Sequence, residues 1–233
     1  MTSSAAAPAL DRCRFAVVDV ETTGGRAASG GRLLEVGVAI LEGGTVHLAF
    51  DALLDPGIPI PPWVTGLTGI TGGMVAGRPR FMAIAADLRH ALAGGEFVAH
   101  NARFDWRFLA AECAAAGVPA PGGEPLCTIR LTRRLVPELR HRGLDAVATF
   151  FGIENPARHR AFGDALATAH VLRALLGRAQ ERGVETLEQL WALHETPNRL
   201  RIADCGLRHT RGSVVARATH HVESAIRNPQ SEL

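Results

Sequence analysis

Four acidic residues lie where the surrounding pattern favours apolar side chains. Asp19 and Glu21 are two positions apart at the end of a short apolar run, so their side chains share one face of a predicted strand. Asp105 follows Phe104 in a helical pattern, and Asp164 lies near the start of an alanine-rich helical pattern. Carboxylates placed together raise one another's energy unless a cation neutralises them. Such oxygen ligands suit Mg²⁺ or Mn²⁺, whereas zinc prefers histidine and cysteine.

A mixed sheet is expected to position these acids. Apolar runs bounded by turn residues predict strands over residues 15–20, 33–41, 45–54 and 97–99. Helical patterns are predicted over residues 81–92, 101–117, 128–135, 144–151, 161–179 and 185–194, with Asn101 as the cap of the second. Strands followed by a helix, a further strand and several helices indicate an α/β fold with helices flanking the sheet.

The composition is that of an ordinary globular protein. The chain has 233 residues, of which 47% are hydrophobic and 21% are charged, enough for one domain with a sizeable core. It has neither a membrane-length apolar run nor a secretory signal pattern, and its four cysteines form no CxxC pair. We therefore expect a cytoplasmic protein with reduced thiols.

The formal net charge of +2 does not by itself indicate a nucleic-acid-binding protein, but the charge is unevenly distributed. We divide the chain into an N-terminal extension (1–13), a domain (14–197) and a basic C-terminal appendage (198–233). The appendage holds six arginines against three acids, and residues 130–142 form a second basic stretch. Both stretches could add phosphate contacts, although such charges are usually solvated and the appendage could instead pack on the core.

Three short motifs carry a resemblance to a known family. The residues from Val18 to Gly24 (VDVETTG), His100 to Asp105 (HNARFD) and His159 to Asp164 (HRAFGD) resemble the three motifs of the DEDDh exonucleases, in the same order and at similar spacing. Residues 62–71 are similar to the family segment that lines the 3′-terminal nucleotide, and residues 144–153 to the helix before the third motif. The resemblance covers about residues 14–180 and is strongest toward the proofreading epsilon subunit of DNA polymerase III and its free-standing relatives.

The resemblance implies a ribonuclease-H-like fold and 3′→5′ removal of nucleoside monophosphates. Two divalent ions, Mg²⁺ or Mn²⁺, would be held by Asp19, Glu21, Asp105 and Asp164 and would serve an in-line phosphodiester displacement. His159 would act as the general base on the attacking water, because imidazoles titrate near neutrality.

Substrate contacts are also implied by the resemblance. The candidate residues are Thr22, Thr23, Gly24, Leu67, Thr68, His100, Asn101 and Phe104. The sequence departs from the family at two positions: Gly25 replaces a wedge residue that is often Leu or Met, and Trp63 replaces an acidic or polar residue. These departures bear on mismatch preference and on recognition of the 3′-OH, not on the metal ligands.

The expected partner is DNA with a free 3′ end, and two alternatives stay open. One is an exoribonuclease of the same fold, because tolerance of a 2′-OH depends on pocket shape that no motif reports. The other is a non-catalytic accessory module that binds a DNA polymerase or sliding clamp. Residues 189–193 (QLWAL) faintly resemble a bacterial clamp-binding peptide, but Leu190 and Leu193 also fit a helical core pattern.

Overall fold

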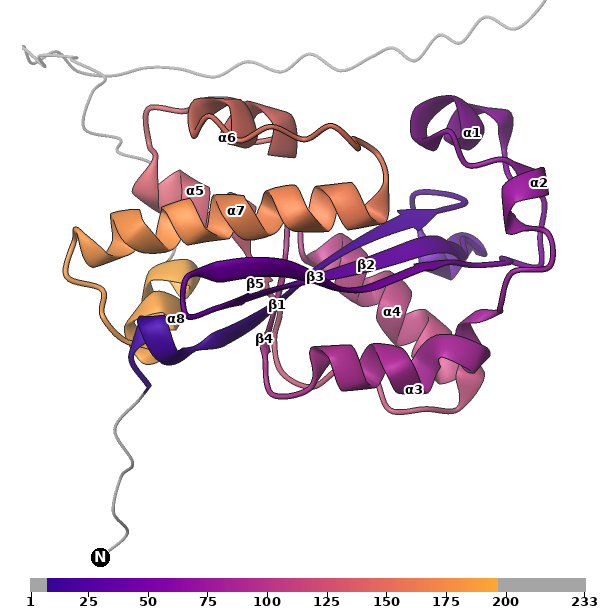
Figure 1. Ribbon diagram of the computed structural model, residues 1–233, viewed down its shortest axis with the longest axis horizontal. Helices are drawn as coiled ribbons and strands as arrows, with labels where there is room; N and C mark the ends of the chain where they lie inside the picture. The colour runs from indigo at the N-terminus through magenta and orange to yellow at the C-terminus, as the bar shows by residue number, and fades with distance from the viewer. Residues whose placement is uncertain (1–7, 197–233) are drawn as a thin grey trace, which may run out of the picture. The chain divides into compact units, whose positions relative to one another are not determined.

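The computed structural model describes residues 8–196, which form a five-stranded mixed sheet flanked by helices (Figure 1). The strand order is β3-β2-β1-β4-β5, with β1 antiparallel to β2 and parallel to β4. The strands are β1 (Arg14–Thr22), β2 (Leu33–Glu42), β3 (Thr45–Leu53), β4 (Glu96–Ala99) and β5 (Leu126–Cys127). The predicted α/β class is confirmed.

Helices cover both faces of this sheet. One face is covered by α7 (Ala161–Gln180), with α5 (Thr128–Leu135) and α6 (Leu144–Phe150) packed against it, and the other by α3 (Phe81–Leu92) and α4 (Arg103–Ala116) (Figure 1). The remaining helices are α1 (Pro62–Thr68), α2 (Gly72–Val75), α8 (Leu187–Glu195) and two 3₁₀ turns, η1 (Leu10–Arg12) and η2 (Ala27–Ser29). None of the helices within residues 8–196 is long and apolar enough to cross a membrane.

The alternation of side chains along β1 divides the core in two. Phe15 and Val17 point into the core beneath α7, whereas Val18 and Val20 belong to the core beneath α3 and α4. Because side chains alternate along a strand, Asp19 and Glu21 continue the series that faces α7. The sheet therefore presents its acidic strand end to the first turn of that helix.

The two ends of the packed region are hydrogen-bonded to each other. The Leu10 amide donates to the Glu185 carbonyl at 2.9 Å, and the Leu187 amide donates to the Pro8 carbonyl at 3.1 Å. Leu10 and Cys13 are buried in the core beneath α7. Residues 8–13, expected to lie in an N-terminal extension, thus pack with the domain.

Three local expectations differ from the structure. Asn101 does not cap α4: it has a left-handed φ of 68°, and the helix starts at Arg103 without a side-chain cap. The two-residue strand β5 was not predicted. The helix expected from residue 185 begins at Leu187, after a capping box formed by Thr186 and Gln189.

The segment that resembles a clamp-binding peptide lies within α8. Leu190 is fully buried there, and Leu193 is half-buried against the same core. A clamp could not reach Leu190 without unfolding this helix. The interpretation of residues 189–193 as a clamp-binding peptide is therefore wrong, and their apolar spacing reflects core packing.

The buried histidine of α8 makes this helix sensitive to acid. His194 Nε2 accepts a hydrogen bond from the Cys127 amide at 3.0 Å, which only an unprotonated nitrogen can do. Burial, and to a lesser extent the nearby charge of Arg130, lowers the pKa of His194 to about 4. Because the pKa of a histidine in the unfolded chain is about 6.5, the unfolded chain binds more protons than the folded chain as the pH falls below that value.

We therefore expect the contribution of His194 to stability to be complete above about pH 6.5 and to be lost as the pH falls toward 4. His194→Gln keeps an acceptor for the Cys127 amide but cannot titrate. The measurement is the free energy of unfolding in urea at pH 7 and pH 5 for both proteins. An equal fall in both would contradict the assignment.

Candidate active site

Three carboxylates meet at the carboxyl end of β1. Asp19 and Glu21 from the strand and Asp164 from the first turn of α7 each offer an oxygen, and these oxygens lie within 4.8 Å of one another. All three side chains are half-buried. We name these three residues the acid trio. Asp164 is more than 140 positions after Asp19 and Glu21 in the sequence, and the packing of α7 across the sheet brings it to them.

The fourth predicted acid, Asp105, lies beside the trio in the first turn of α4. It is buried, and its Oδ1 accepts a hydrogen bond from the Val20 amide at 3.2 Å. Its negative charge contributes to raising the pKa of Asp19. Asp105 thus approaches β1 at the residue between Asp19 and Glu21, although it is outside the set of mutually close oxygens.

The electrostatics of the site favour a bound cation. Burial, followed by the charges of Asp105 and Asp164, raises the pKa of Asp19 well above its usual range. Burial and the charge of Asp164 raise the pKa of Glu21 to about 8. Oxygen donors that repel one another in this way fit a hard divalent cation, which would remove both the repulsion and the raised pKa values.

Asp164 is held by two hydrogen bonds from the loop that precedes α7. The Asn155 side-chain amide donates to Oδ1 at 2.5 Å, and the His159 backbone amide donates to Oδ2 at 3.2 Å. His159 has a left-handed φ of 57°, a conformation that residues other than glycine adopt rarely. The loop therefore links the candidate base directly to the carboxylate of the trio.

Sequence reasoning missed Asn155 and Glu35. Asn155 lies in a loop and has no distinguishing pattern. Glu35 did give a signal, because it is an acid inside the otherwise apolar run at 33–41, and the structure shows it almost completely buried. It lies directly opposite Glu21 in the β1–β2 ladder.

The threonines after β1 use their hydroxyl groups within their own loop. Thr22 Oγ1 donates to the Gly24 carbonyl at 2.8 Å, and Thr23 Oγ1 accepts from the Arg32 amide at 2.9 Å. Both residues are buried. Thr23 and Gly24 line a hollow of about 450 Å³ together with Gly25, Ile58, Pro59 and Pro61.

The two candidate contacts in α1 differ in exposure. Leu67 is 51% exposed and Trp63, one helical turn earlier, is 60% exposed, so both are available to a base or sugar. Thr68 is buried, and its hydroxyl donates to the Val64 carbonyl and accepts from the Ile70 amide. Thr68 therefore shapes the helix end rather than offering a free polar group.

In the second motif, both ring nitrogens of one residue already have hydrogen-bond partners. His100 Nε2 lies 2.9 Å from the Arg142 carbonyl and Nδ1 lies 2.8 Å from the Thr128 hydroxyl, so neither ring nitrogen is free for substrate. Asn101 is exposed. Phe104 is half-buried, with its ring 5.0 Å from that of Phe108 and tilted against it.

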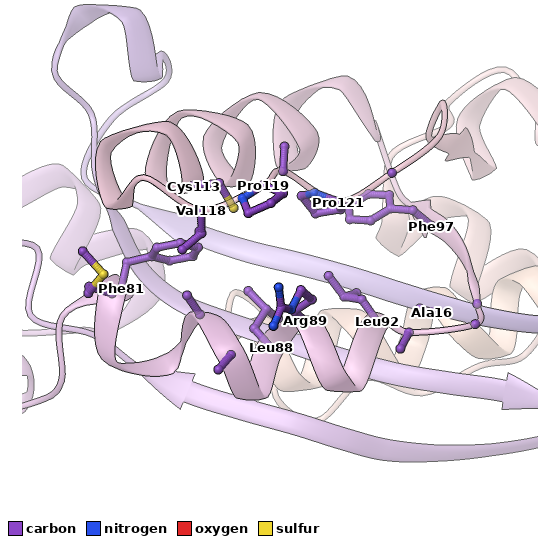
Figure 2. Close-up of a pocket in the computed structure, with 18 residues that line it drawn as sticks. Ala16, Phe81, Leu88, Arg89, Leu92, Phe97, Cys113, Val118, Pro119 and Pro121 are labelled. Carbon is purple, nitrogen blue, oxygen red and sulfur yellow. The ribbon is translucent and has the colours of Figure 1, made fainter.

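An apolar cavity of about 470 Å³ lies away from the acids (Figure 2). It is formed between α3 and residues 118–122, with Phe81, Leu88 and Phe97 among its walls and Arg89 pointing into it. None of the four acids lines it. Since α3 covers the sheet face opposite α7, the cavity is not part of the candidate active site.

The repulsion within the trio predicts a stabilising substitution. Asp19→Asn removes one charge from the cluster, so at pH 8 in EDTA we expect a melting temperature several degrees above that of the wild type. Glu42→Gln, at the opposite end of the β1–β2 ladder, is the control and should not raise it. Differential scanning calorimetry measures both. A lower melting temperature for Asp19→Asn would show that the acids are not mutually destabilising.

The fold is ribonuclease-H-like, and the acid trio gives it a candidate site for a divalent cation. The model of the exonuclease family (RNase_T) matches residues 16–172, and the chain belongs to this family. The predicted membership in an exonuclease family is confirmed.

Relatives contain this region as a small part of longer proteins. The chain is 29% identical to the 3′-5′ exonuclease DinG of Bacillus subtilis over 95% of its own length and 24% of that protein. It is 38% identical to a Mycobacterium tuberculosis protein whose name includes both exonuclease and endonuclease, over 78% of this chain and 29% of that protein. The chain therefore spans less than a third of the length of these curated relatives.

Among solved structures, exonuclease X in complex with 5′-overhanging duplex DNA is 28% identical, with a TM-score of 0.60. The match covers 78% of this chain and 99% of that one. The nuclease domain of 3′hExo, a DEDDh family member bound to rAMP, has a TM-score of 0.61 at 17% identity, with 75% of this chain and 95% of that one covered, and supports the fold alone.

Proposed function

We propose that the chain is a metal-dependent exonuclease that removes nucleoside monophosphates from the 3′ ends of DNA. The observation that carries this proposal is the acid trio of Asp19, Glu21 and Asp164, with His159 bonded through its backbone to the third member. The exonuclease family supplies the reaction class. Hydrolysis then breaks the bond between phosphorus and the 3′ oxygen of the preceding nucleotide.

Each site residue has a role in this proposal. The trio and Asp105 would hold two divalent ions, Mg²⁺ or Mn²⁺, which when bound stabilise charge on the attacking and leaving oxygens. His159 would accept the proton of the attacking water, and Asp164 orients the backbone of that residue. Asn155 fixes the Asp164 carboxylate.

The substrate side is formed by backbone and apolar groups. The terminal nucleotide would lie along the hollow lined by Gly24, Ile58 and Pro59, and the exposed side chains of Leu67 and Trp63 would contact its base or sugar. The exposed Asn101 and the half-buried Phe104 complete the candidate contacts. Aromatic and apolar faces that accept any unstacked base favour a nuclease with little sequence preference.

The proposal is tested with matched DNA and RNA oligonucleotides labelled at the 5′ or the 3′ end. With Mg²⁺ or Mn²⁺, we expect 5′-labelled DNA to give a ladder shortened one nucleotide at a time, and 3′-labelled DNA to release labelled mononucleotide at once. EDTA should abolish both. Faster digestion of RNA would favour the exoribonuclease alternative, and no digestion would favour an accessory module.

Four further expectations stay predictions. Residues 198–233, expected to add phosphate contacts, lie outside the described residues. A polymerase partner is supported by similarity to a PolC-type DNA polymerase III of Caldanaerobacter subterraneus, 31% identical over 76% of this chain and 12% of that protein. Cytoplasmic location and a role in proofreading or repair belong to the same proposal.

A further inference from the structure

We infer that Glu35 and Arg160 form a clamp that positions Asp164 and His159 for metal binding and catalysis. Both residues lie outside the proposed ligand set, and the inference rests on the function proposed above. Glu35 is on β2, directly opposite Glu21 of the trio, and is only 1% exposed. Arg160 stands between the candidate base and the first residue of α7.

The clamp is built from a charge-assisted pair and a backbone hydrogen bond. Arg160 Nε lies 3.0 Å from Glu35 Oε2, and Arg160 Nη2 lies 2.5 Å from Oε1. The Ala161 amide donates to Oε2 at 2.8 Å. One buried carboxylate thus holds both the side chain and the backbone at the start of the helix, with the directional geometry of a guanidinium fork.

These contacts lie one helical turn before Asp164, a proposed metal ligand. The Asp164 amide donates to the Arg160 carbonyl at 2.9 Å, so a shift of Arg160 moves the turn that carries the Asp164 carboxylate. The left-handed residue His159 lies directly before the clamp. Its strained conformation is therefore held from one side by Asp164 and from the other by Arg160 and Ala161.

Close packing of the strand supports the same role. A Cβ atom on Gly37, two residues after Glu35, would lie 2.5 Å from the Ala161 carbonyl oxygen. The helix start therefore rests on the β2 backbone directly opposite Asp19, with which Gly37 is paired. Glu35 and Gly37 together fix how far the first turn of α7 stands from the acid trio.

A purely electrostatic role makes a different prediction. The charge of Glu35 contributes to raising the pKa of Glu21, whereas the charge of Arg160 lowers it. If the two residues acted only through their charges, Glu35→Gln would weaken cation binding and Arg160→Gln would strengthen it. If the pair positions Asp164, both substitutions weaken binding, by about 10–100-fold as for other groups that support metal ligands.

The experiment measures Mn²⁺ binding to the full chain in the absence of nucleic acid, by electron paramagnetic resonance of the free ion. Glu42→Gln, which breaks an exposed Arg14–Glu42 pair at the far end of the same strand, is the matched control and should bind as the wild type does. Arg160→Lys keeps the charge but not the fork, and replaces Arg160→Gln if that variant does not fold. Melting temperatures in EDTA confirm that each variant is folded at the assay temperature.

Weaker Mn²⁺ binding in both Glu35→Gln and Arg160→Gln, or in Arg160→Lys, with Glu42→Gln unchanged, is the expected result. Opposite effects of the two glutamine substitutions, or wild-type affinity in Arg160→Lys, would overturn the positioning role and favour a purely electrostatic one. Wild-type affinity in every clamp variant, with an active wild-type nuclease, would overturn this inference alone. A wild-type chain that neither binds Mn²⁺ nor degrades DNA would overturn the proposed function as well.

Discussion

Asp164→Asn is expected to reduce 3′-end digestion to the level seen in EDTA while leaving the fold intact. The substitution preserves the size of the side chain but removes the charge of a trio member, so the remaining acids present a weaker and incomplete ligand set. It also changes the partner of the Asn155 amide and the His159 amide, which both donate to this carboxylate. The rate is measured on a 5′-labelled oligonucleotide in saturating Mg²⁺.

Asp87→Asn is the control for this prediction, because Asp87 is an exposed acid in α3, on the opposite face of the sheet. It should digest DNA at the wild-type rate. Near-wild-type digestion by Asp164→Asn, with the same cation, would remove the acid trio from the catalytic site.

Replacing His159 is expected to slow turnover by roughly 10²–10⁴, the usual range for loss of a positioned general base. Asparagine is the suitable replacement, because it tolerates a positive φ better than alanine and so leaves the loop conformation at 57° in place. A base acts only when unprotonated, so the wild-type rate should fall at acidic pH. The His159→Asn rate should rise with hydroxide concentration and lack that titration.

The rate–pH profiles of the two proteins provide the measurement, and His90→Ala, at an exposed position near the end of α3, provides the control. An unchanged acidic limb in His159→Asn would assign the titration to another group. Loss of Mn²⁺ binding in this variant would indicate that the histidine mainly supports the ligands rather than the proton transfer.

The sequence predicted the elements and the acids because both depend on local patterns. The period of two along β1 correctly placed Asp19 and Glu21 on one face. The helical patterns placed Asp105 on the helix expected over residues 101–117 and Asp164 near the start of the next long one, and the structure has both in the first turns of helices. Strand β5 was missed because two residues are too few to show a period.

The contacts that support the site could not be predicted in the same way. Glu35 and Arg160 are 125 positions apart, and their pairing depends on the β1–β2 register and on the approach of α7. The roles of His100 and Thr68 depend on which groups already satisfy their polar atoms, and this is decided by neighbours distant in sequence or by helix-end geometry. A motif gives residue identity, but it does not give the hydrogen-bond partners.

The hydrogen bonds between residues 8–10 and 185–187 bear on how this domain can be joined to others. Because the two ends of the packed region touch, the domain could be inserted into a surface loop of a host protein without separating the flanking halves. The same proximity allows circular permutation: a short linker could join the ends, and the chain could be opened at the exposed Gly43–Gly44 turn, far along β1 and β2 from the acids. The arrangement of the proposed site residues therefore does not depend on the point at which the chain enters and leaves the domain.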